Sequence, residues 1–424
     1  MPRAQSPWAH RAFWALWFGT LAARLGNQIA VIALTWLVLR TTGSGARIGI
    51  TLSLYAVGDM AASPFVGILL DRLPRRALLM VGALLLAGIF VALAATFSSH
   101  HLPFGGLLAS VVVAGALLPL TYLGRMIILP NLVGAAQWES ANTAMQFNMN
   151  LVTLLGPALG GVLVTVVGIS GTVCITALGY LLYAGCLLVI PRFAFRTEAP
   201  AGSLSLRSDL TVGWRFLREV PLLAVLTAVT LLFSLTYGPL EPALPVLVRT
   251  VFHGGPETLG FFWSAFAVGA LIGTAVWGWL RPAWSIRFVV AGIIVAWGIF
   301  SGALGLLGHA WLAMVSLALG GLTYAPYNIL YATWRQRLVP DALRGKVFGA
   351  VNSLTGIGLP IGQALGGMLI ALVGASHTVL LGGMACVALG VVVYTARPLW
   401  AASTLPLPEG TASTLPTSAT RAPL

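Results

Sequence analysis

Charged side chains are the scarcest feature of this sequence. Only 8% of its 424 residues are charged, whereas soluble globular domains carry about a quarter. Hydrophobic residues make up 58% of the chain, which leaves too little charge to cover a water-exposed surface and excludes a soluble fold. A helix needs about 20 apolar residues to span the hydrocarbon core of a bilayer. Runs of that length recur along nearly the whole chain, which predicts an all-α integral membrane protein.

Cysteines and catalytic motifs are also scarce. The three cysteines, Cys174, Cys186 and Cys386, lie in apolar segments without a CxxC pair, so we expect buried thiols, no metal site and no cofactor. Neither GxSxG nor HExxH occurs. The nearest approach to a phosphate-binding loop, Arg344 to Val347, lacks both the upstream glycine and the following Ser or Thr. We therefore expect neither an enzyme nor an ATP-driven pump.

The basic residues lie at the ends of the apolar segments and gather on one side. With twelve helices and the N-terminus inside, only Arg40, Arg47 and Arg249 of the 23 basic residues reach the outer side, and Arg24 and Arg125 stay in the membrane. This asymmetry is what the positive-inside rule describes. It predicts twelve transmembrane helices in the cell inner or plasma membrane, with both termini cytoplasmic. The net charge of +13 is then a topology signal, and no nucleic-acid partner is expected.

The two halves of the chain resemble each other. GPALGGVLVTVVG from Gly156 aligns without gaps to GQALGGMLIALVG from Gly362, a shift of 206 residues, with 8 of 13 positions identical. A duplicated six-helix unit predicts similarity at half the chain length. We expect a six-helix bundle over 1–191, a cytoplasmic linker over 192–220, a second six-helix bundle over 221–400 and a disordered cytoplasmic tail over 401–424.

The linker is predicted to contain an interfacial helix. Four apolar side chains fall on one face at helical spacing, which is typical of a helix lying along the cytoplasmic membrane surface. These are Leu206, Leu210, Trp214 and Leu217.

A short loop carries a family resemblance. GILLDRLPRR, from Gly67 to Arg76, lies between the second and third predicted helices. It resembles the signature loop of the major facilitator superfamily, G-x-x-x-D-R-x-x-R-R, although Pro74 stands where a glycine is common. In that family the loop's charges lock the two halves together on the cytoplasmic side when the transporter faces outward. The resemblance assigns this gate to Gly67, Asp71, Arg72, Arg75 and Arg76. The equivalent loop of the second half, Gly278 to Arg287, keeps a glycine and basic residues but no acid.

Three further stretches indicate which branch of the superfamily the chain resembles. DLTVGWRFLREVPLL from Asp209 and RQRLVPDALRGKVFG from Arg335 resemble the branch that includes enterobactin exporters and macrolide efflux proteins. The fifth helix carries GPxxGG, which resembles the core of a motif associated with drug and proton antiporters. Close helix packing at the glycines and a kink at the proline explain the same residues. They are Gly156, Pro157, Gly160 and Gly161.

The resemblance implies a fold and a function. The expected fold is the major facilitator fold, with twelve transmembrane helices in two pseudo-symmetric bundles, and we expect a monomer. The expected function is secondary active transport, as proton-coupled efflux of a small amphipathic molecule, siderophore or drug-like, by alternating access. A passive facilitator, an importer of a small metabolite and a non-transporting membrane sensor stay open as alternatives. The expected partners are the small-molecule substrate, the proton as coupling ion and the lipid bilayer.

Four charged residues lie well inside the predicted helices: Arg24, Asp59, Arg125 and Glu241. Ionisable groups at membrane depth are costly, so each is a candidate for function. Asp59 and Glu241 are the proton-coupling candidates, with a static ion pair between Arg24 and Asp59 as an open alternative. Glu241 lies in YGPLEPALP, whose prolines predict an interrupted seventh helix bordering a cavity or gate. Arg125 either snorkels or contacts an anionic substrate.

Polar side chains recur at helical spacing in the fifth and tenth predicted helices. A polar face of this kind predicts a cavity wall, with interhelical hydrogen bonding as the alternative. Tyrosine and asparagine side chains suit an amphipathic aromatic substrate. The predicted cavity residues are Arg24, Asn27, Arg125, Asn142, Gln146, Asn150, Tyr324, Tyr327, Asn328, Tyr331 and Asn352.

Overall fold

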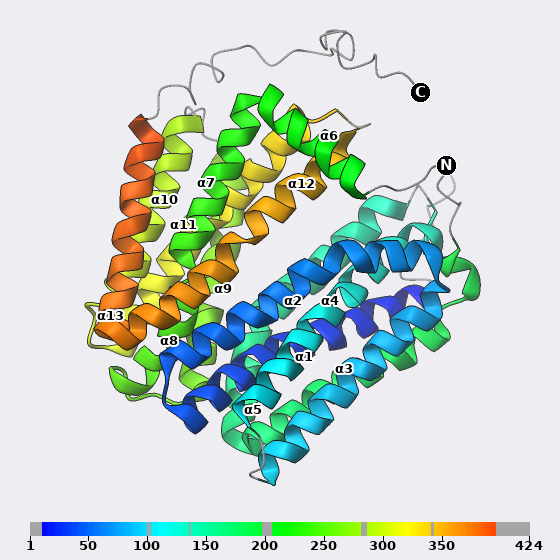
Figure 1. Ribbon diagram of the computed structural model, residues 1–424, viewed down its shortest axis with the longest axis horizontal. Coiled ribbons are helices and arrows are strands. Elements are labelled where there is room, and N and C mark those ends of the chain that lie inside the picture. The colour runs from blue at the N-terminus through cyan, green and yellow to red at the C-terminus, as the bar shows by residue number, and fades with distance from the viewer. Residues whose placement is uncertain are drawn as a thin grey trace.

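The computed structural model describes residues 11–99, 103–134, 137–196, 206–280, 286–340 and 343–395, and within these ranges it contains helices and no strand (Figure 1). The predicted tail at 401–424 lies outside the described residues. In chain order the elements are α1 (Arg11–Thr42), α2 (Gly45–Arg72), α3 (Arg75–Ser98), α4 (Phe104–Leu132), α5 (Trp138–Val189), the short 3-10 helix η3 (Arg192–Phe195), α6 (Leu206–Glu219), α7 (Pro221–Tyr237), α8 (Leu240–Thr250), α9 (Pro256–Leu280), α10 (Ile286–Ala303), α11 (Ala310–Leu338), α12 (Arg344–Gly356) and α13 (Gly358–Thr395).

Two long helical spans each fold back on themselves at a glycine. The spans at 138–189 and 344–395 are 52 residues long, about twice what one membrane crossing needs. Gly168 has φ 75° and ψ 174°, and Gly374 has φ 82° and ψ 165°, a backbone region open essentially to glycine alone. The two glycines are 206 residues apart, which is the shift of the sequence repeat. With these breaks, the long apolar helices are those of a multi-pass membrane protein and are consistent with twelve crossings.

The predicted break in the seventh helix is present. Helix α7 ends at Tyr237 and α8 begins at Leu240, with a turn at Gly238 and Pro239 between them. Gly238 lies against the backbone of Gly362 in α13, so no larger side chain fits there without displacing that helix. The break therefore directs the first turn of α8 toward the interior of the molecule.

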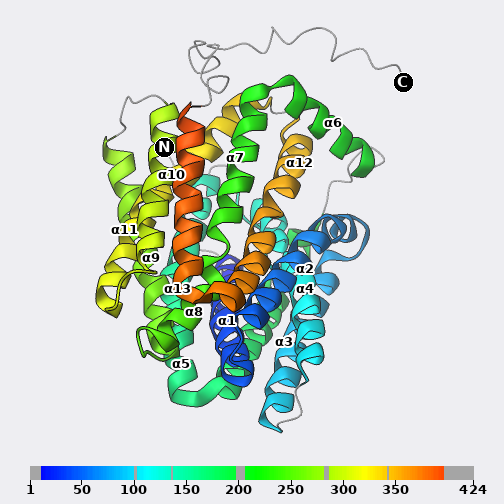
Figure 2. The same ribbon diagram turned by 60° about the vertical axis from the view of Figure 1, so that its left-hand side comes forward.

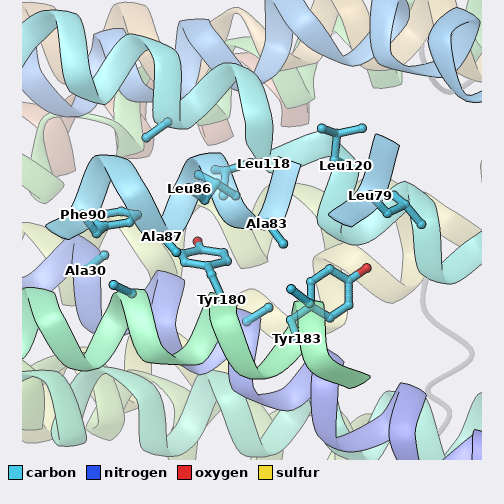
Figure 3. Packing of buried hydrophobic residues seen from close by; sticks show 14 of the residues in the cluster. Ala30, Leu79, Ala83, Leu86, Ala87, Phe90, Leu118, Leu120, Tyr180 and Tyr183 are labelled. Atoms are coloured by element: carbon cyan, nitrogen blue, oxygen red, sulfur yellow. The ribbon is translucent and has the colours of Figure 1, made fainter. Parts of the chain in front are cut away.

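Each half of the described chain has its own hydrophobic core. One core is built from buried side chains between Phe13 and Phe195, and the other is built almost entirely from side chains between Val229 and Val393. In the first core, Phe90 of α3 stacks on Tyr180 of α5 with ring centroids 5.7 Å apart, and Tyr183 lies one turn further along α5 (Figure 3). The two groups of helices lie together near the start of α2 and α8 and diverge toward α6 (Figure 1).

The two halves meet through paired backbone contacts. Helix α5 packs on α9, where Gly161 lies against Glu257 and Pro157 against Gly260. Helix α13 packs on α2 in the same way.

The second set of contacts repeats the first at corresponding positions. Gly367 lies against Ala46, and Gln363 against Gly49. On one side of the contacts, residues 161 and 367 correspond, as do 157 and 363, and each pair is 206 positions apart, which is the repeat shift. On the other side, residues 46 and 257 correspond, as do 49 and 260, and each pair is 211 positions apart. Gly67 and Gly278 of the two signature loops are also 211 positions apart. The two contacts therefore occupy corresponding positions of the two repeats that the sequence indicated.

The linker helix forms, but its apolar face binds protein. Gly213 of α6 lies against Lys346 and Ala350 of α12, and Phe216 and Leu217 join a small core with residues of α12. Figure 2 shows α6 lying across the end of α12. Trp214 is 47% exposed and lies beside the guanidinium of Arg218 at 5.7 Å.

The predicted interfacial face is therefore divided. Leu217 is buried against the second half of the protein, and Trp214 faces outward. The side chains of Leu206 and Leu210 lie outside the described part of the structure. The interpretation of all four as one membrane-facing stripe was wrong, because Phe216 and Leu217 find partners on α12.

Candidate functional site

A cavity lies between the two halves. The empty space inside it amounts to about 780 Å³ when the open solvent at its mouth is counted. The lining is mostly apolar, with a few polar groups from both halves. It is formed by Gln28, Val31, Ile32, Thr35, Leu52, Thr153, Pro157, Tyr237, Glu241, Pro245, Leu259, Trp263 and Phe266.

Glu241 is the acid that lines this cavity. It lies in the first turn of α8, directly after the break, and is half-buried. The Tyr237 hydroxyl donates to its Oε1 at 2.9 Å, and Gln363 Nε2 donates to its Oε2 at 2.5 Å. No cation of the described chain lies within ion-pair distance of it. Gln363 escaped the sequence analysis, although the repeat pairs it with Pro157 of GPxxGG.

Asp59 lies on α2 in contact with α4. The Tyr122 hydroxyl donates to Asp59 Oδ1 at 3.0 Å and lies 3.2 Å from the hydroxyl of Ser63. The proposed ion pair with Arg24 is not formed in the described structure, where Arg24 Nη1 donates instead to the sulfur of Met149. Asp59 is thus held by the Tyr122 hydroxyl within the first half.

Asn27 is occupied by a contact within the first half. Its side-chain oxygen accepts a hydrogen bond from the Tyr55 hydroxyl, which joins α1 to α2. Asn27 is half-buried, and Tyr55 is buried. Asn27 therefore fits the alternative of interhelical hydrogen bonding and not that of a cavity wall.

The polar stripe of α5 continues the cavity wall. Thr153 and Pro157 line the cavity, and Asn150 and Gln146 lie one and two turns earlier on the same face. Gln146 Nε2 donates to Asn150 Oδ1 at 3.2 Å. Asn142, one turn further, is exposed and donates to the carbonyl of its own helix at Trp138.

A different asparagine of α5 escaped the sequence analysis. Asn148 is 1% exposed and donates from Nδ2 to the Trp17 carbonyl at 2.8 Å. In the same contact, Trp17 Nε1 donates to the Ala144 carbonyl at 3.0 Å. Asn148 lies off the four-residue stripe, and the two bonds join α1 to α5 in the interior of the first half.

The tyrosines of α11 divide between packing and the cavity side. Tyr324 lies 5.4 Å from the ring of Trp297 and 5.7 Å from that of Phe266, which itself lines the cavity. Tyr327 is 3% exposed, and its hydroxyl lies 2.7 Å from that of Thr230. In this conformation Tyr327 packs within the second half, as the alternative of interhelical hydrogen bonding describes.

Asn328, Tyr331 and Asn352 lie toward the predicted cytoplasmic end. Asn328 is exposed and Tyr331 is half-buried. Asn352 Oδ1 accepts a hydrogen bond from Arg335 Nη1 at 2.8 Å. The guanidinium of Arg335 lies 5.1 Å from the ring of Tyr331 and 4.3 Å from that of Phe348. Arg335 lies in the last turn of α11.

The hydrogen bonds and the ion pair of the signature loop described below lie within the first half. Arg75 Nη2 bonds Asp71 Oδ1 at 3.1 Å, and its Nε donates to the Leu70 carbonyl. Arg76 donates to the Leu188 carbonyl at 2.6 Å. Arg72 is exposed, and Gly67 has open space beside it. In this conformation Asp71 is thus paired inside its own loop.

The GPxxGG motif lies at the contact between halves. Gly156 and Gly160 lie against α1, and Gly161 against α9. Three hydrogen bonds join the halves beside it: Thr165 to Glu257 Oε2 at 2.6 Å, Ser264 to the Leu154 carbonyl at 2.7 Å, and Arg249 to the Leu39 carbonyl at 3.1 Å. The bonds of Thr165 and Arg249 lie toward the predicted outer end, so the halves are joined there in this conformation.

Comparison with known proteins gives one family and full-length relatives. The family described as transmembrane secretion effector, of the major facilitator type, matches residues 3–402. The multidrug efflux pump Tap of Mycolicibacterium fortuitum is 28% identical over 387 residues, covering 88% of this chain and 93% of the relative. Macrolide efflux protein A of Streptococcus pyogenes is 22% identical over 385 residues, covering 90% and 94%.

Solved transporter structures share the fold. The nucleoside transporter NupG superposes with a TM-score of 0.72 at 13% identity, covering 92% of this chain and 99% of that one. The peptide transporter POT in complex with sulfate superposes with a TM-score of 0.72 at 15% identity, covering 92% and 94%.

Proposed function

Because this chain belongs to the transmembrane secretion effectors of the major facilitator superfamily, we propose that it exports a small amphipathic molecule in exchange for protons. Relatives named as efflux pumps match it over nearly their whole length, which supports export over import. The cavity between the halves, apolar with a few polar groups, suits a drug-like or siderophore-like molecule. Alternating access then moves the cavity opening from one side of the membrane to the other, with both termini in the cytoplasm.

The observation that carries the proposal is the placement of Glu241. Its carboxyl group lies on the cavity wall, at the helix break, with one hydroxyl and one amide donor and no cation beside it. A carboxyl group in that position can hold a proton when substrate is absent and release it as substrate binds. Asp59 is the second candidate. It accepts its hydrogen bond from Tyr122 within the first half.

Coupled transport in membrane vesicles tests this function. Inside-out vesicles with an imposed proton gradient are expected to accumulate an amphipathic dye through the parent protein. Glu241→Gln preserves the side chain's size and removes the titratable group, so gradient-driven accumulation should fall at least tenfold while passive exchange of dye continues. Asp59→Asn is compared in parallel.

The outcomes separate the alternatives. If both variants keep full gradient-driven accumulation, proton coupling by these acids is refuted. Dye that equilibrates through the parent without accumulating would identify a passive facilitator. No dye movement under any ion gradient would favour a non-transporting sensor.

A further inference from the structure

Two arginines lie on contacting helices of the first half without a counter-charge. Arg24 of α1 and Arg125 of α4 are both half-buried, and α1 packs on α4. Among the described residues neither guanidinium has a carboxylate within 4.0 Å. A cation within a membrane-spanning segment is costly, and such cations normally pair with an acid or with backbone carbonyls. Two unpaired cations on contacting helices therefore need an explanation.

Their hydrogen-bonding capacity is almost unused. Arg24 donates to the sulfur of Met149, which is a weak acceptor, and Arg125 has no hydrogen-bond partner in the described structure. A guanidinium group carries five N–H donors in a planar fork. In the described chain, no other nitrogen of these two groups is a fully buried atom without a hydrogen-bond partner. These nitrogens are therefore at least partly accessible.

Arg24 lies on the cavity side of α1. It is one turn before Gln28, and its partner Met149 is one turn before Thr153 on α5; both Gln28 and Thr153 line the cavity. Arg24 and Met149 therefore form the next layer of the same wall, toward the predicted cytoplasmic end. A molecule in the cavity can reach the guanidinium from that layer.

Asp59 does not neutralise the pair. It accepts its hydrogen bond from Tyr122 and forms no ion pair with Arg24. Glu241 lies on the second-half wall, bound by Tyr237 and Gln363. Neither intramembrane acid thus pairs with the two guanidinium groups, and α9 contributes aromatic rings to the cavity lining.

We propose that Arg24 and Arg125 bind the anionic group of the transported molecule, and that the substrate class is an amphipathic organic anion. The planar donor fork of arginine suits a carboxylate, sulfonate or phosphate group. The apolar part of the molecule then lies against Trp263 and Phe266, which line the cavity from α9. This inference rests on the proposed export function and specifies its substrate.

Two xanthene dyes of opposite charge test the assignment. Fluorescein carries a free carboxylate and is anionic at pH 7.4, whereas rhodamine 6G has the same ring system with an esterified carboxyl group and is cationic. Binding of each dye to the purified full-length protein is measured by fluorescence anisotropy. Arg24→Gln and Arg125→Gln are each expected to weaken fluorescein binding at least tenfold and to change rhodamine 6G binding less than twofold.

Matched variants separate charge from structure. Arg24→Lys keeps the charge and should restore fluorescein binding to within about threefold of the parent, since lysine binds anions as a point charge. Arg47→Gln removes an arginine that lies on the ring of Phe104, at the predicted outer end, and should leave both dyes unaffected. Thermal unfolding of every variant confirms that the fold is retained.

Several results would overturn the inference. Equal loss of both dyes in the Gln variants would assign the arginines to structure. Binding of rhodamine 6G but not fluorescein would refute an anionic substrate and, if vesicles also accumulate rhodamine 6G, would leave the export function intact. Failure of both dyes to bind or to accumulate would contradict the export function as well.

Discussion

At the scale of single residues, hydrogen bonds that were not visible in the periodicity hold the first half together. The four-residue spacing picked out Asn142, Gln146 and Asn150, which face outward or toward the cavity. Asn148 lies between them and is the buried one, bonded to the Trp17 carbonyl. Periodicity identifies a face but not its partner, so the sequence could not separate a cavity residue from a packing residue.

Replacing Asn148 should therefore destabilise the protein more than replacing its exposed neighbour. Asn148→Ala removes a buried interhelical hydrogen bond, and we expect a loss of about 1 kcal/mol in the free energy of unfolding. Gln146→Ala, on the same helix, should cost little, because Gln146 is exposed. Unfolding temperatures in detergent measure both. Equal effects of the two substitutions would contradict the assigned role of Asn148.

At the scale of helices, two glycines allow long helical stretches to reverse. The apolar pattern runs through Gly168 and Gly374 without a proline or a charged residue to mark the turn. Both turns were nevertheless predictable to within a few residues, because the loop charges and the 206-residue repeat required a crossing to end there. The positive φ angles themselves, 75° and 82°, were not predictable from composition.

Substitution at these turns should be costly. Gly168→Ala or Gly374→Ala forces a side chain into a backbone region used essentially by glycine, at a cost of roughly 1–3 kcal/mol each. Gly185→Ala is the matched control, since Gly185 lies in the regular part of α5 with open space beside it. The yield of folded protein and its unfolding temperature should fall for the first two variants only. A neutral Gly374→Ala would show that the turn tolerates another conformation.

At the scale of the whole molecule, the contacts between α5 and α9 and between α2 and α13 describe one end state. The repeat and the loop charges predicted two halves, and the structure pairs those halves through matching glycine contacts. The sequence could not show which end would be closed, because both conformations of a transporter come from the same chain. Contacts between halves, such as the bond between Thr165 and Glu257, depend on how the helices pack and leave no pattern in the sequence.

Cross-linking those two positions should trap the protein. In a background with Cys174, Cys186 and Cys386 replaced, Thr165→Cys with Glu257→Cys places two thiols where a 2.6 Å hydrogen bond now joins the halves. A short bifunctional thiol reagent should abolish transport, and a cleavable version should restore it after reduction. Each single-cysteine variant should keep its activity after the same treatment. Undiminished transport by the cross-linked protein would show that this end never opens.

The matched contacts between halves also bear on the history of the gene. An ancestral half-length chain pairing with a second copy would have carried both contacts in identical form, so that one base change altered both. After fusion each contact could diverge alone. Thr165 and Glu257 correspond, by shifts of 206 and 211, to Ala371 and Ala46, which can form no such hydrogen bond. The hydrogen bond between Thr165 and Glu257 thus belongs to one copy of the contact, and the two copies are no longer equivalent.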